Sequence, residues 1–424
     1  MDVTGADREV GTLIIGAGVT GLAFADWLGD DDYLIAEATD AIGGYCKTVL
    51  QDGFVWDYSG HFFHFRHREV ERYLVARMGP AAVRTVTRDS RIWYRERFVD
   101  FPFQKNIHQL SKREFIECLV DLYFREDRPA SSFRDMLYAK FGRAIADKFL
   151  VPYNEKLYAT DLDTLDPDAM GRFFPYADFA EVLANFRAAD NRGYNATFTY
   201  PVAGAIEYVR ALAQGVDAGR VQLDTPVLEV DLGAHVARTS RGRVRYERLV
   251  STAPLPRLLQ MCGLPHDPAV YSANTVEVFN LGFDRKGPDG VHWIYYPQRE
   301  LCFYRVGFYD NILGADRMSL YVEIGRPGPA AVPHDASATL GEVLEGLRRA
   351  GVVEDHRLVS HHRVVLDPAY VHITTASNAD VRTQRARLGA QDVYSIGRYG
   401  GWTYCSIEDG IVEARALVEQ LGLR

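Results

Sequence analysis

The sequence contains few cysteines and no long apolar run. Its five cysteines, Cys46, Cys118, Cys262, Cys302 and Cys405, are odd in number and widely spaced. Such a set predicts neither a disulfide framework nor a zinc site, so we expect reduced thiols and a cytoplasmic protein. The longest nearly uncharged stretch, 11–25, is interrupted by glycines, so no transmembrane segment is predicted. The polar and acidic first ten residues are not typical of a signal peptide.

Positive charge is also scarce. The 48 lysines and arginines are outnumbered by 57 acids, which gives a net charge of −9. This balance argues against nucleic acid or an anionic membrane as the main partner. An anionic ligand would have to be held by locally placed arginines. The 424 residues, of which 47% are hydrophobic, are too many for one compact core and predict two or three domains.

The N-terminal region carries a dinucleotide-binding pattern. An apolar run ends at Ile15 and is followed by Gly16, Gly18 and Gly21, with Thr20 inside the turn. The first glycine permits the turn, the second lets backbone approach a pyrophosphate, and the third lets helix pack on strand. The helix N-terminus then offers unpaired N–H groups to phosphates. Glu37, 21 positions after Gly16, stands where an acid accepts hydrogen bonds from a ribose.

A second glycine motif follows, with Gly43, Gly44 and Lys47. A glycine pair just after the ribose acid resembles the second signature of FAD-binding oxidoreductases of the amine-oxidase and mutase type. An ordinary glycine-containing loop is the simpler interpretation. The two motifs in tandem favour FAD over NAD as the cofactor.

The next segment, 53–65, is rich in aromatic and β-branched residues and predicts a strand that ends in a turn at Gly60 and His61. His61, His64 and His67 have a spacing that suits one helix face. Because this region has strand and turn character without a carboxylate cluster, we predict no metal site. Aromatic packing is the main alternative, and contact of His61 with a flavin is another.

Helical periodicity begins at Ser111, where Ser111 and Glu114 form a capping box. Ser132 opens a second helix that is expected to run through Lys148, and Pro152 is expected to interrupt the pattern. Residues 106–190 therefore predict a helical, substrate-binding insertion.

The predicted fold class is α/β. It combines a Rossmann-like FAD-binding domain, a helical insertion and an antiparallel β-sheet domain. The FAD domain is expected to be discontinuous and to comprise 1–90, 201–265 and 385–424; Val227, in an alternating segment of its middle part, is a further expected cofactor contact. The sheet domain is expected to comprise 91–105, 191–200 and 266–384. An amphipathic helix is predicted around 335–350, and a C-terminal one from Gly410 to Leu421.

Six further segments resemble the UDP-galactopyranose mutase family, the eukaryotic-type branch in particular. They are 98–108, 151–159, 170–173, 195–198, 303–305 and 397–404. Together they span nearly the whole chain in order, so the resemblance is to the complete family architecture.

The resemblance implies a redox-neutral use of FAD, which is active when reduced. In this family the flavin N5 attacks the anomeric carbon of a nucleotide sugar and expels the nucleoside diphosphate, and the sugar ring then opens and recloses. The implied activity is that of an isomerase that interconverts UDP-galactopyranose and UDP-galactofuranose. NAD(P)H as reductant is compatible with the resemblance, because the eukaryotic branch binds it without a second nucleotide motif.

Site residues follow from the same resemblance. Arg172 and Arg305 match the two arginines that hold the pyrophosphate, where guanidinium forks suit phosphate geometry. His61 matches a histidine beside the flavin, and Gly397 and Arg398 match flavin contacts. The implied substrate-binding set is Phe103, Gln104, Tyr153, Asn154, Asn195, Tyr295, Tyr370 and Tyr404, with the first two at the uracil.

The sequence also departs from the family. Phe101 stands where tyrosine is common, and Lys105 replaces the usual asparagine. These departures leave the identity of the sugar and of the base open. The alternative function is an FAD-dependent oxidase or desaturase of the amine-oxidase or protoporphyrinogen-oxidase type, which would need no paired arginines. A flavoprotein scaffold with a decayed site is a third interpretation.

Overall fold

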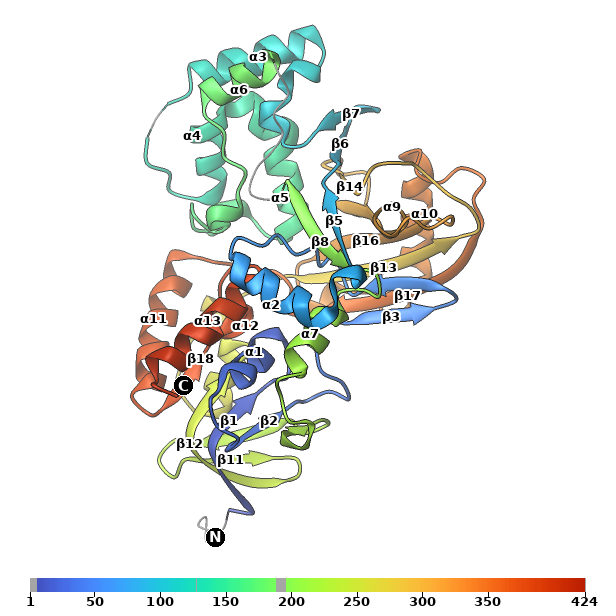
Figure 1. Cartoon of the computed structure of the whole chain (residues 1–424). Helices are drawn as coiled ribbons and strands as arrows, with labels where there is room; N and C mark the ends of the chain where they lie inside the picture. The colour runs from blue at the N-terminus through green and yellow to red at the C-terminus, as the bar shows by residue number, and fades with distance from the viewer. Residues whose placement is uncertain (1–5, 127, 188–195, 424) are drawn as a thin grey trace.

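The structure is a computed structural model, and it describes residues 6–126, 128–187 and 196–423. Three parts are visible in Figure 1: a nucleotide-binding part that holds both chain ends, a helical part at the opposite end, and a second sheet beside them. This arrangement agrees with the predicted fold class.

The first sheet has seven strands: β1 (Arg8–Ile15), β2 (Tyr33–Ala36), β9 (Val221–Gln222), β10 (Val227–Asp231), β11 (Val236–Thr239), β12 (Gly242–Ser251) and β18 (Val393–Ser395). β1 lies between β2 and β12 and runs parallel to both. Because β1 is covered on both faces, six of its eight residues are buried, as is usual for parallel strands. Helix α1 (Val19–Trp27) follows β1 directly and packs against α13 (Ile407–Gln420).

The second sheet has the order β17-β13-β16-β15-β14-β6-β7. Its strands are β6 (Ser90–Tyr94), β7 (Arg97–Asp100), β13 (Thr275–Phe283), β14 (Trp293–Tyr295), β15 (Arg305–Phe308), β16 (Ser319–Arg326) and β17 (Leu358–Leu366). All neighbouring strands are antiparallel except β14 and β6, which run parallel, so the predicted antiparallel sheet contains one parallel pair. β8 (Thr197–Pro201) pairs with β5 (Val83–Thr87) outside this sheet, although 191–200 was expected to belong to it.

The helical part contains α3 (Lys112–Tyr123), α4 (Phe133–Ile145), α5 (Val151–Tyr158) and α6 (Phe179–Arg187). Ser111 and Ser132 cap α3 and α4 as predicted. The expected interruption at Pro152 was wrong. The chain passes from α4 through a π-helical turn into α5, and Pro152 lies in the first turn of α5, where its missing N–H has no cost.

The remaining elements connect these parts. They are β3 (Thr48–Gln51), β4 (Phe54–Asp57), α2 (Arg68–Met78), α7 (Ile206–Ala213), α8 (Leu255–Met261), α9 (Tyr309–Leu313), α10 (Ala336–Arg349), α11 (Thr375–Gly389) and α12 (Gly397–Gly400). The predicted helix around 335–350 is confirmed by α10, whereas α11 was not predicted. Within the described part of the chain, no helix has both the length and the apolarity needed to cross a membrane.

Candidate flavin and substrate site

The glycine turn after β1 has the geometry that its sequence predicts. Gly16 has φ +98°, and a Cβ there would lie 2.4 Å from Thr252 Oγ1. A Cβ on Gly21 would lie 2.1 Å from the Gly16 carbonyl oxygen. Since neither position accepts a side chain, the backbone turns tightly and brings the first turn of α1 beside the end of β1.

Glu37 lies at the end of β2, beside this turn. Its Oε2 accepts a hydrogen bond from the Ala17 N–H at 2.7 Å, and its Oε1 accepts from the backbone N–H of Thr39 at 2.9 Å. Lys47 also contacts Thr39, because its Nζ donates a hydrogen bond to Thr39 Oγ1 at 3.2 Å. The carboxylate is therefore fixed next to the glycine turn.

The second glycine motif crosses in front of the first. Gly18 and Gly43 form a β-bridge, and a Cβ on Gly44 (φ +57°) would lie 3.5 Å from the Cα of Gly18. No side chain caps the N-terminus of α1, and its first turn contains no acid. Two glycine backbones and an uncapped helix start form a cradle that fits a pyrophosphate. These residues fit FAD.

The other expected cofactor residues lie around this cradle. Thr20 packs between two glycines: a Cβ on Gly397 would lie 2.8 Å from its Oγ1, and one on Gly410 would lie 2.4 Å away. This close approach brings the N-terminal ends of α1, α12 and α13 together. Val227 is buried at the start of β10.

His61 lies where the nucleotide-binding part meets the second sheet. Its Nδ1 is buried without a hydrogen-bond partner among the described residues. Burial lowers the pKa of His61 to about 4, with opposing contributions from the charges of Glu323 and Arg398. The imidazole is therefore neutral at physiological pH. Gly60 packs tightly beside it, because a Cβ there would lie 2.5 Å from the Tyr321 hydroxyl.

Arg305 extends from β15 toward Glu323 on the adjacent strand β16. The two residues are cross-strand partners, and the guanidinium donates from Nε at 2.8 Å and from Nη2 at 2.6 Å to the two carboxylate oxygens. Ser59 Oγ also donates to Glu323. The side chains are only 19% and 1% exposed. Burial alone would raise the pKa of the Glu323 carboxyl, but the bidentate pairing with Arg305 lowers it below its usual value. The pair is therefore ionised, and its geometry is rigid.

Tyrosines surround this arginine. Tyr153 contacts Tyr295 edge to face, with ring centroids 5.3 Å apart, and Tyr370 stacks on Tyr404 at 5.8 Å. Burial raises the pKa values of Tyr153, Tyr370 and Tyr404, and the charge of Arg305 opposes that rise in each case. These phenols remain protonated and can donate hydrogen bonds.

Arg398, on α12, completes the group. Its guanidinium carbon lies 4.9 Å from the Tyr404 ring centre and 5.3 Å from that of Tyr370. It donates to the carbonyl oxygen of Cys405 at 2.9 Å, and no carboxylate among the described residues pairs with it within 4.0 Å. Its positive charge is therefore not neutralised by the protein.

Arg172 lies at the edge of this cluster. Its guanidinium pairs with Asp409 at the start of α13 and lies 4.2 Å from the Phe173 ring centre. Phe173 in turn contacts Tyr404 at 5.2 Å. Arg172 is thus connected through aromatic side chains to Tyr404, which lies beside Arg398, and Arg172 is about one-third exposed.

The residues expected at the base lie deeper. Phe103 is fully buried and stacks on Phe149 at 5.3 Å; Phe149 also stacks on Tyr153 at 5.2 Å. Gln104 and Asn154 are buried, and the side-chain oxygen of each has no hydrogen-bond partner among the described residues. Asn195, expected near the nucleotide and the sugar, lies outside the described residues.

The C-terminal end of α5 is attached to the second sheet by buried polar groups. Lys156 Nζ donates to the carbonyl oxygens of Tyr296 at 2.9 Å and Gln298 at 2.8 Å, and also to that of Phe303. Burial lowers the pKa of Lys156 to about 7. Asn274 donates to the Leu157 carbonyl at 2.5 Å. The Leu157 carbonyl is one of those that a helix end leaves unpaired, whereas Lys156 satisfies carbonyls of the β14–β15 loop.

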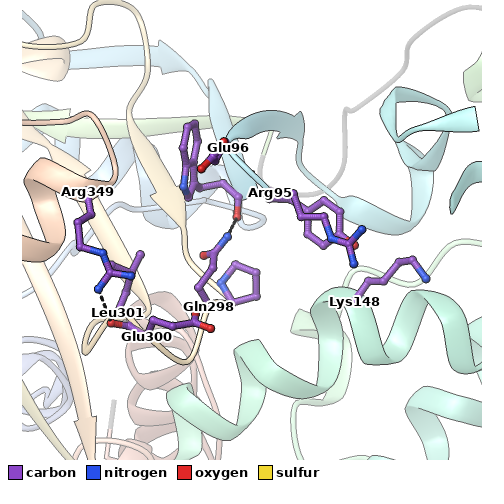
Figure 2. A pocket seen from close by; sticks show the side chains of 10 residues that line it. Arg95, Glu96, Lys148, Gln298, Glu300, Leu301 and Arg349 are labelled. Carbon is purple, nitrogen blue, oxygen red and sulfur yellow. Dashed lines mark hydrogen bonds between the residues drawn. The ribbon is translucent and has the colours of Figure 1, made fainter.

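A pocket of about 470 Å³ lies on the outer side of the β14–β15 loop. Figure 2 shows Gln298 between Lys148 on one side and Arg349 on the other, with Glu300 below. Gln298 Nε2 donates to the Trp93 carbonyl at 2.6 Å. None of the expected site residues lines this pocket.

Glu323 was missed by sequence reasoning. The available signal was a lone acid in the otherwise apolar strand 319–324, since a charge in a buried strand needs a partner. In the described ranges, no group of three or more His, Cys, Asp or Glu side chains is arranged to hold a metal ion.

Known proteins share this architecture. A structure of reduced UDP-galactopyranose mutase has a TM-score of 0.89 and 24% identity, over 98% of this chain and 94% of the other. A protein from Exiguobacterium assigned to the protoporphyrinogen oxidases has a TM-score of 0.77 and 18% identity, over 99% of both chains. Cyclohexylamine oxidase from Brevibacterium oxydans has a TM-score of 0.65 and 14% identity, over 97% of this chain and 99% of the other.

At these identities the likenesses establish the fold. Residues 19–420 match the family of flavin-containing amine oxidoreductases. That match covers nearly the whole chain and includes Gly21, the second glycine motif, the arginine and tyrosine cluster, and α13. The protein is a flavoprotein that uses FAD, and the chain belongs to the flavin-containing amine oxidoreductase family.

Proposed function

We propose that this protein is a mutase that interconverts the pyranose and furanose forms of a nucleotide sugar, with UDP-galactopyranose and UDP-galactofuranose as the first pair to test. The observation that carries the proposal is the convergence of Arg305 and Arg398 with the hydroxyl-bearing rings of Tyr295, Tyr370 and Tyr404. Such a group suits a diphosphate and has no purpose toward an uncharged apolar substrate.

Electrostatics supports an anionic substrate. Glu323 neutralises Arg305, but Arg398 keeps its charge, so the site is positive in a protein of net charge −9. Arg305 uses Nε and Nη2 for Glu323, which leaves Nη1 to donate to a phosphate oxygen. Protonated tyrosines add neutral donors, and charge-assisted bonds of this kind are short and directional.

Each residue then has a role in the reaction. Reduced FAD, when bound, supplies the nucleophile for the anomeric carbon. Arg305 and the tyrosines hold the diphosphate as its bond to that carbon breaks, and they retain it for return. Neutral His61 lies near the same charges and keeps its unpaired Nδ1 available for a hydrogen bond.

The unpaired oxygens of Gln104 and Asn154 support a base with N–H groups at the far end of the site. A buried acceptor without a partner costs about 1–3 kcal/mol, which a ligand donor would recover. The imide N–H of uracil is such a donor.

The test is to incubate the protein with UDP-galactopyranose or its furanose isomer, with oxidised and with dithionite-reduced flavin, and to separate the products. Interconversion only in the reduced protein is expected. Oxygen consumption on an amine or porphyrinogen, with no conversion of nucleotide sugars, would instead assign the oxidase alternative.

Arg305→Ala should lower kcat/KM of the mutase by about 2–4 kcal/mol of transition-state binding, or roughly 30- to 1,000-fold. The matched control is Arg326→Ala, on neighbouring β16. Arg326 is 21% exposed and also pairs with a buried acid, Glu277. A similar loss of activity in both variants would contradict a direct role for Arg305.

A further inference from the structure

One lysine links the helical part to the second sheet beside the candidate site. Lys156 lies on α5, three positions after Tyr153. Its Nζ donates hydrogen bonds to three backbone carbonyl oxygens, those of Tyr296, Gln298 and Phe303. An ammonium group has three N–H donors and no acceptor. All of its donors are therefore used by the backbone of one loop.

These carbonyls belong to the loop between β14 and β15, here called the 296–304 loop. Tyr296 directly follows Tyr295, and Phe303 lies two positions before Arg305. Tyr295 and Arg305 are cross-strand partners. The lysine thus holds the loop at both ends, next to two side chains of the candidate site.

Helix α5 carries another side of the same site. The ring of Tyr153 contacts those of Tyr295 and Tyr304 edge to face, with ring centroids 5.3 Å and 6.1 Å apart. Residues three positions apart lie on the same face of a helix, so Tyr153 and Lys156 both face the second sheet, against which α5 packs (Figure 1). The bonds of Lys156 therefore fix α5 against β14 and β15 close to the residues that would hold the substrate.

A second contact between α5 and this loop lies at the surface. Arg299 pairs with Glu155, but the Arg299 side chain is 70% exposed, and exposed ion pairs contribute little. Tyr296 and Phe303 are fully buried, so the bonds that Lys156 donates to their carbonyls are shielded from water. Hydrogen bonds from a charged donor are stronger than neutral ones. Lys156 is therefore the main polar link between the helix and the loop.

We propose that Lys156 is a positioning residue that sets the spacing between α5 and strands β14 and β15. Its ammonium form keeps Tyr153 on the helix and Arg305 on the sheet at the separation that one diphosphate requires. This inference rests on the proposed function, because the diphosphate is the ligand that both sides would hold. A neutral amine has two N–H donors and cannot hold all three carbonyl oxygens, so deprotonation of Lys156 loosens the loop.

The protonation of Lys156 makes this positioning depend on pH. Burial lowers the pKa of Lys156 to about 7, and Cys302 and Glu300 on the loop oppose the change. Cys302 is itself neutral near this pH, because burial raises its pKa to about 11. The other ionised groups on α5, on the loop and on the elements that pack most closely against α5 have partners of their own: Glu155 and Arg299 each other, Asp163 Arg134, Lys148 Glu117, Asp147 the Tyr138 hydroxyl, Glu323 Arg305, and Arg326 Glu277.

The contribution of Lys156 to stability should change with pH in the opposite direction to its contribution to binding. The folded-state pKa lies below the unfolded value of about 10.4, so between these values the folded protein binds fewer protons than the unfolded chain. The contribution of this group to stability therefore rises with pH in that range. A loss of ligand affinity without a loss of stability would distinguish positioning from a general weakening of the fold.

The test is calorimetric titration of the oxidised, FAD-loaded protein with UDP-galactopyranose at pH values of about 6.5 and 8.5, between which the diphosphate diester does not titrate. The wild type should bind roughly 5-fold more weakly at the higher pH, as expected when most of one charged hydrogen-bond contribution is lost. Lys156→Met should bind roughly 10-fold more weakly than the wild type at the lower pH, with little further change at the higher one. The matched control is Arg299→Ala, which removes the exposed link and should behave as the wild type.

Hydrogen exchange of peptides from the 296–304 loop provides a measurement that needs no substrate. Exchange should be faster in Lys156→Met than in the wild type and in Arg299→Ala, because the loop has lost its donor. Lys156→Gln keeps an N–H donor and should show an intermediate affinity that does not change with pH. This variant replaces Lys156→Met if the latter does not retain FAD.

Equal affinity in the wild type and the Lys156 variants, or the same pH dependence in all of them, would overturn the inference and leave the proposed function intact. The expected pattern of affinities in a protein that does not convert the nucleotide sugar when reduced would support the positioning role and overturn the mutase reaction alone. A wild-type protein that does not bind UDP-galactopyranose at either pH would overturn both.

Discussion

Removing the Arg305 side chain should destabilise the fold through the acid that it leaves behind. Glu323 is 1% exposed and receives two hydrogen bonds from Arg305. In Arg305→Ala that carboxylate loses both of these bonds and keeps the Ser59 hydroxyl as a donor. The variant should lose stability because a buried charge has lost its counter-charge.

The size of the loss can be estimated. Breaking a buried ion pair by removing one partner costs about 3–5 kcal/mol. Because Arg305 is 19% exposed, water can enter the vacated space, and we expect about 3 kcal/mol. Arg305→Ala/Glu323→Gln replaces the stranded charge by a neutral amide and should recover about half of the loss.

The loss should depend on pH with a defined sign. In the wild type the folded-state pKa of Glu323 is lowered, so the pair stabilises the fold above the unfolded pKa near 4.3 and this contribution fades as the pH falls. In Arg305→Ala, burial without a counter-charge raises the folded-state pKa, so the penalty is complete above that pKa and is relieved by protonation. The gap between the two proteins should therefore narrow from pH 8 to pH 5.

Urea unfolding of the wild type, the single variant and the double variant at pH 8 and pH 5 measures both effects. Arg326→Ala is the matched control, because Glu277 keeps Arg363 at 2.8 Å and the loss should be smaller. A deficit below about 1 kcal/mol at pH 8, or a double variant no more stable than the single one, would refute the reasoning.

Three further changes test the flavin region. Glu37→Ala removes a buried acceptor beside the glycine turn and should weaken FAD binding roughly 10-fold or more, at about 1.5–3 kcal/mol for a charged hydrogen bond; titration of apoprotein by flavin fluorescence measures it, and unchanged affinity would exclude a ribose contact. Gly60→Ala places a Cβ 2.5 Å from the Tyr321 hydroxyl and should cost about 1–3 kcal/mol, which appears as a lower unfolding midpoint unless the ring shifts freely. Burial lowers the pKa of His61 to about 4, so the fold should lose up to about 3 kcal/mol as the pH falls from 7 to 4, at 1.36 kcal/mol per pKa unit. His61→Asn should flatten that part of the pH–stability curve, and an unchanged curve would show that His61 does not titrate in this way.

The sequence was sufficient to predict a structural feature where a short motif determines that feature. The caps at Ser111 and Ser132 could be predicted because each cap and its partner are close in sequence. Glu37 is 20 positions from its partner Ala17, but the dinucleotide-binding pattern fixes the spacing between the glycine turn and this acid. α11 was missed because it is polar around its circumference and shows no apolar stripe.

The pairing of Arg305 with Glu323 could not be predicted in the same way. The two residues are 18 positions apart, and they meet only because β15 and β16 are neighbours in a particular register. Phe103 shows the same limit. Its segment was recognised, but whether its ring is exposed depends on Phe149, 46 positions later.

The attachment of α5 to the second sheet has a mechanical consequence. Lys156 donates hydrogen bonds to the loop that joins Tyr295 to Arg305. A Cβ on Gly325 would lie 2.1 Å from the Lys156 carbonyl oxygen, so the helix packs directly on β16. Because these contacts hold α5 against the second sheet, α5 cannot be the element that moves when the site opens while they are intact. Any widening of the site must therefore either leave α5 against the second sheet or break these hydrogen bonds.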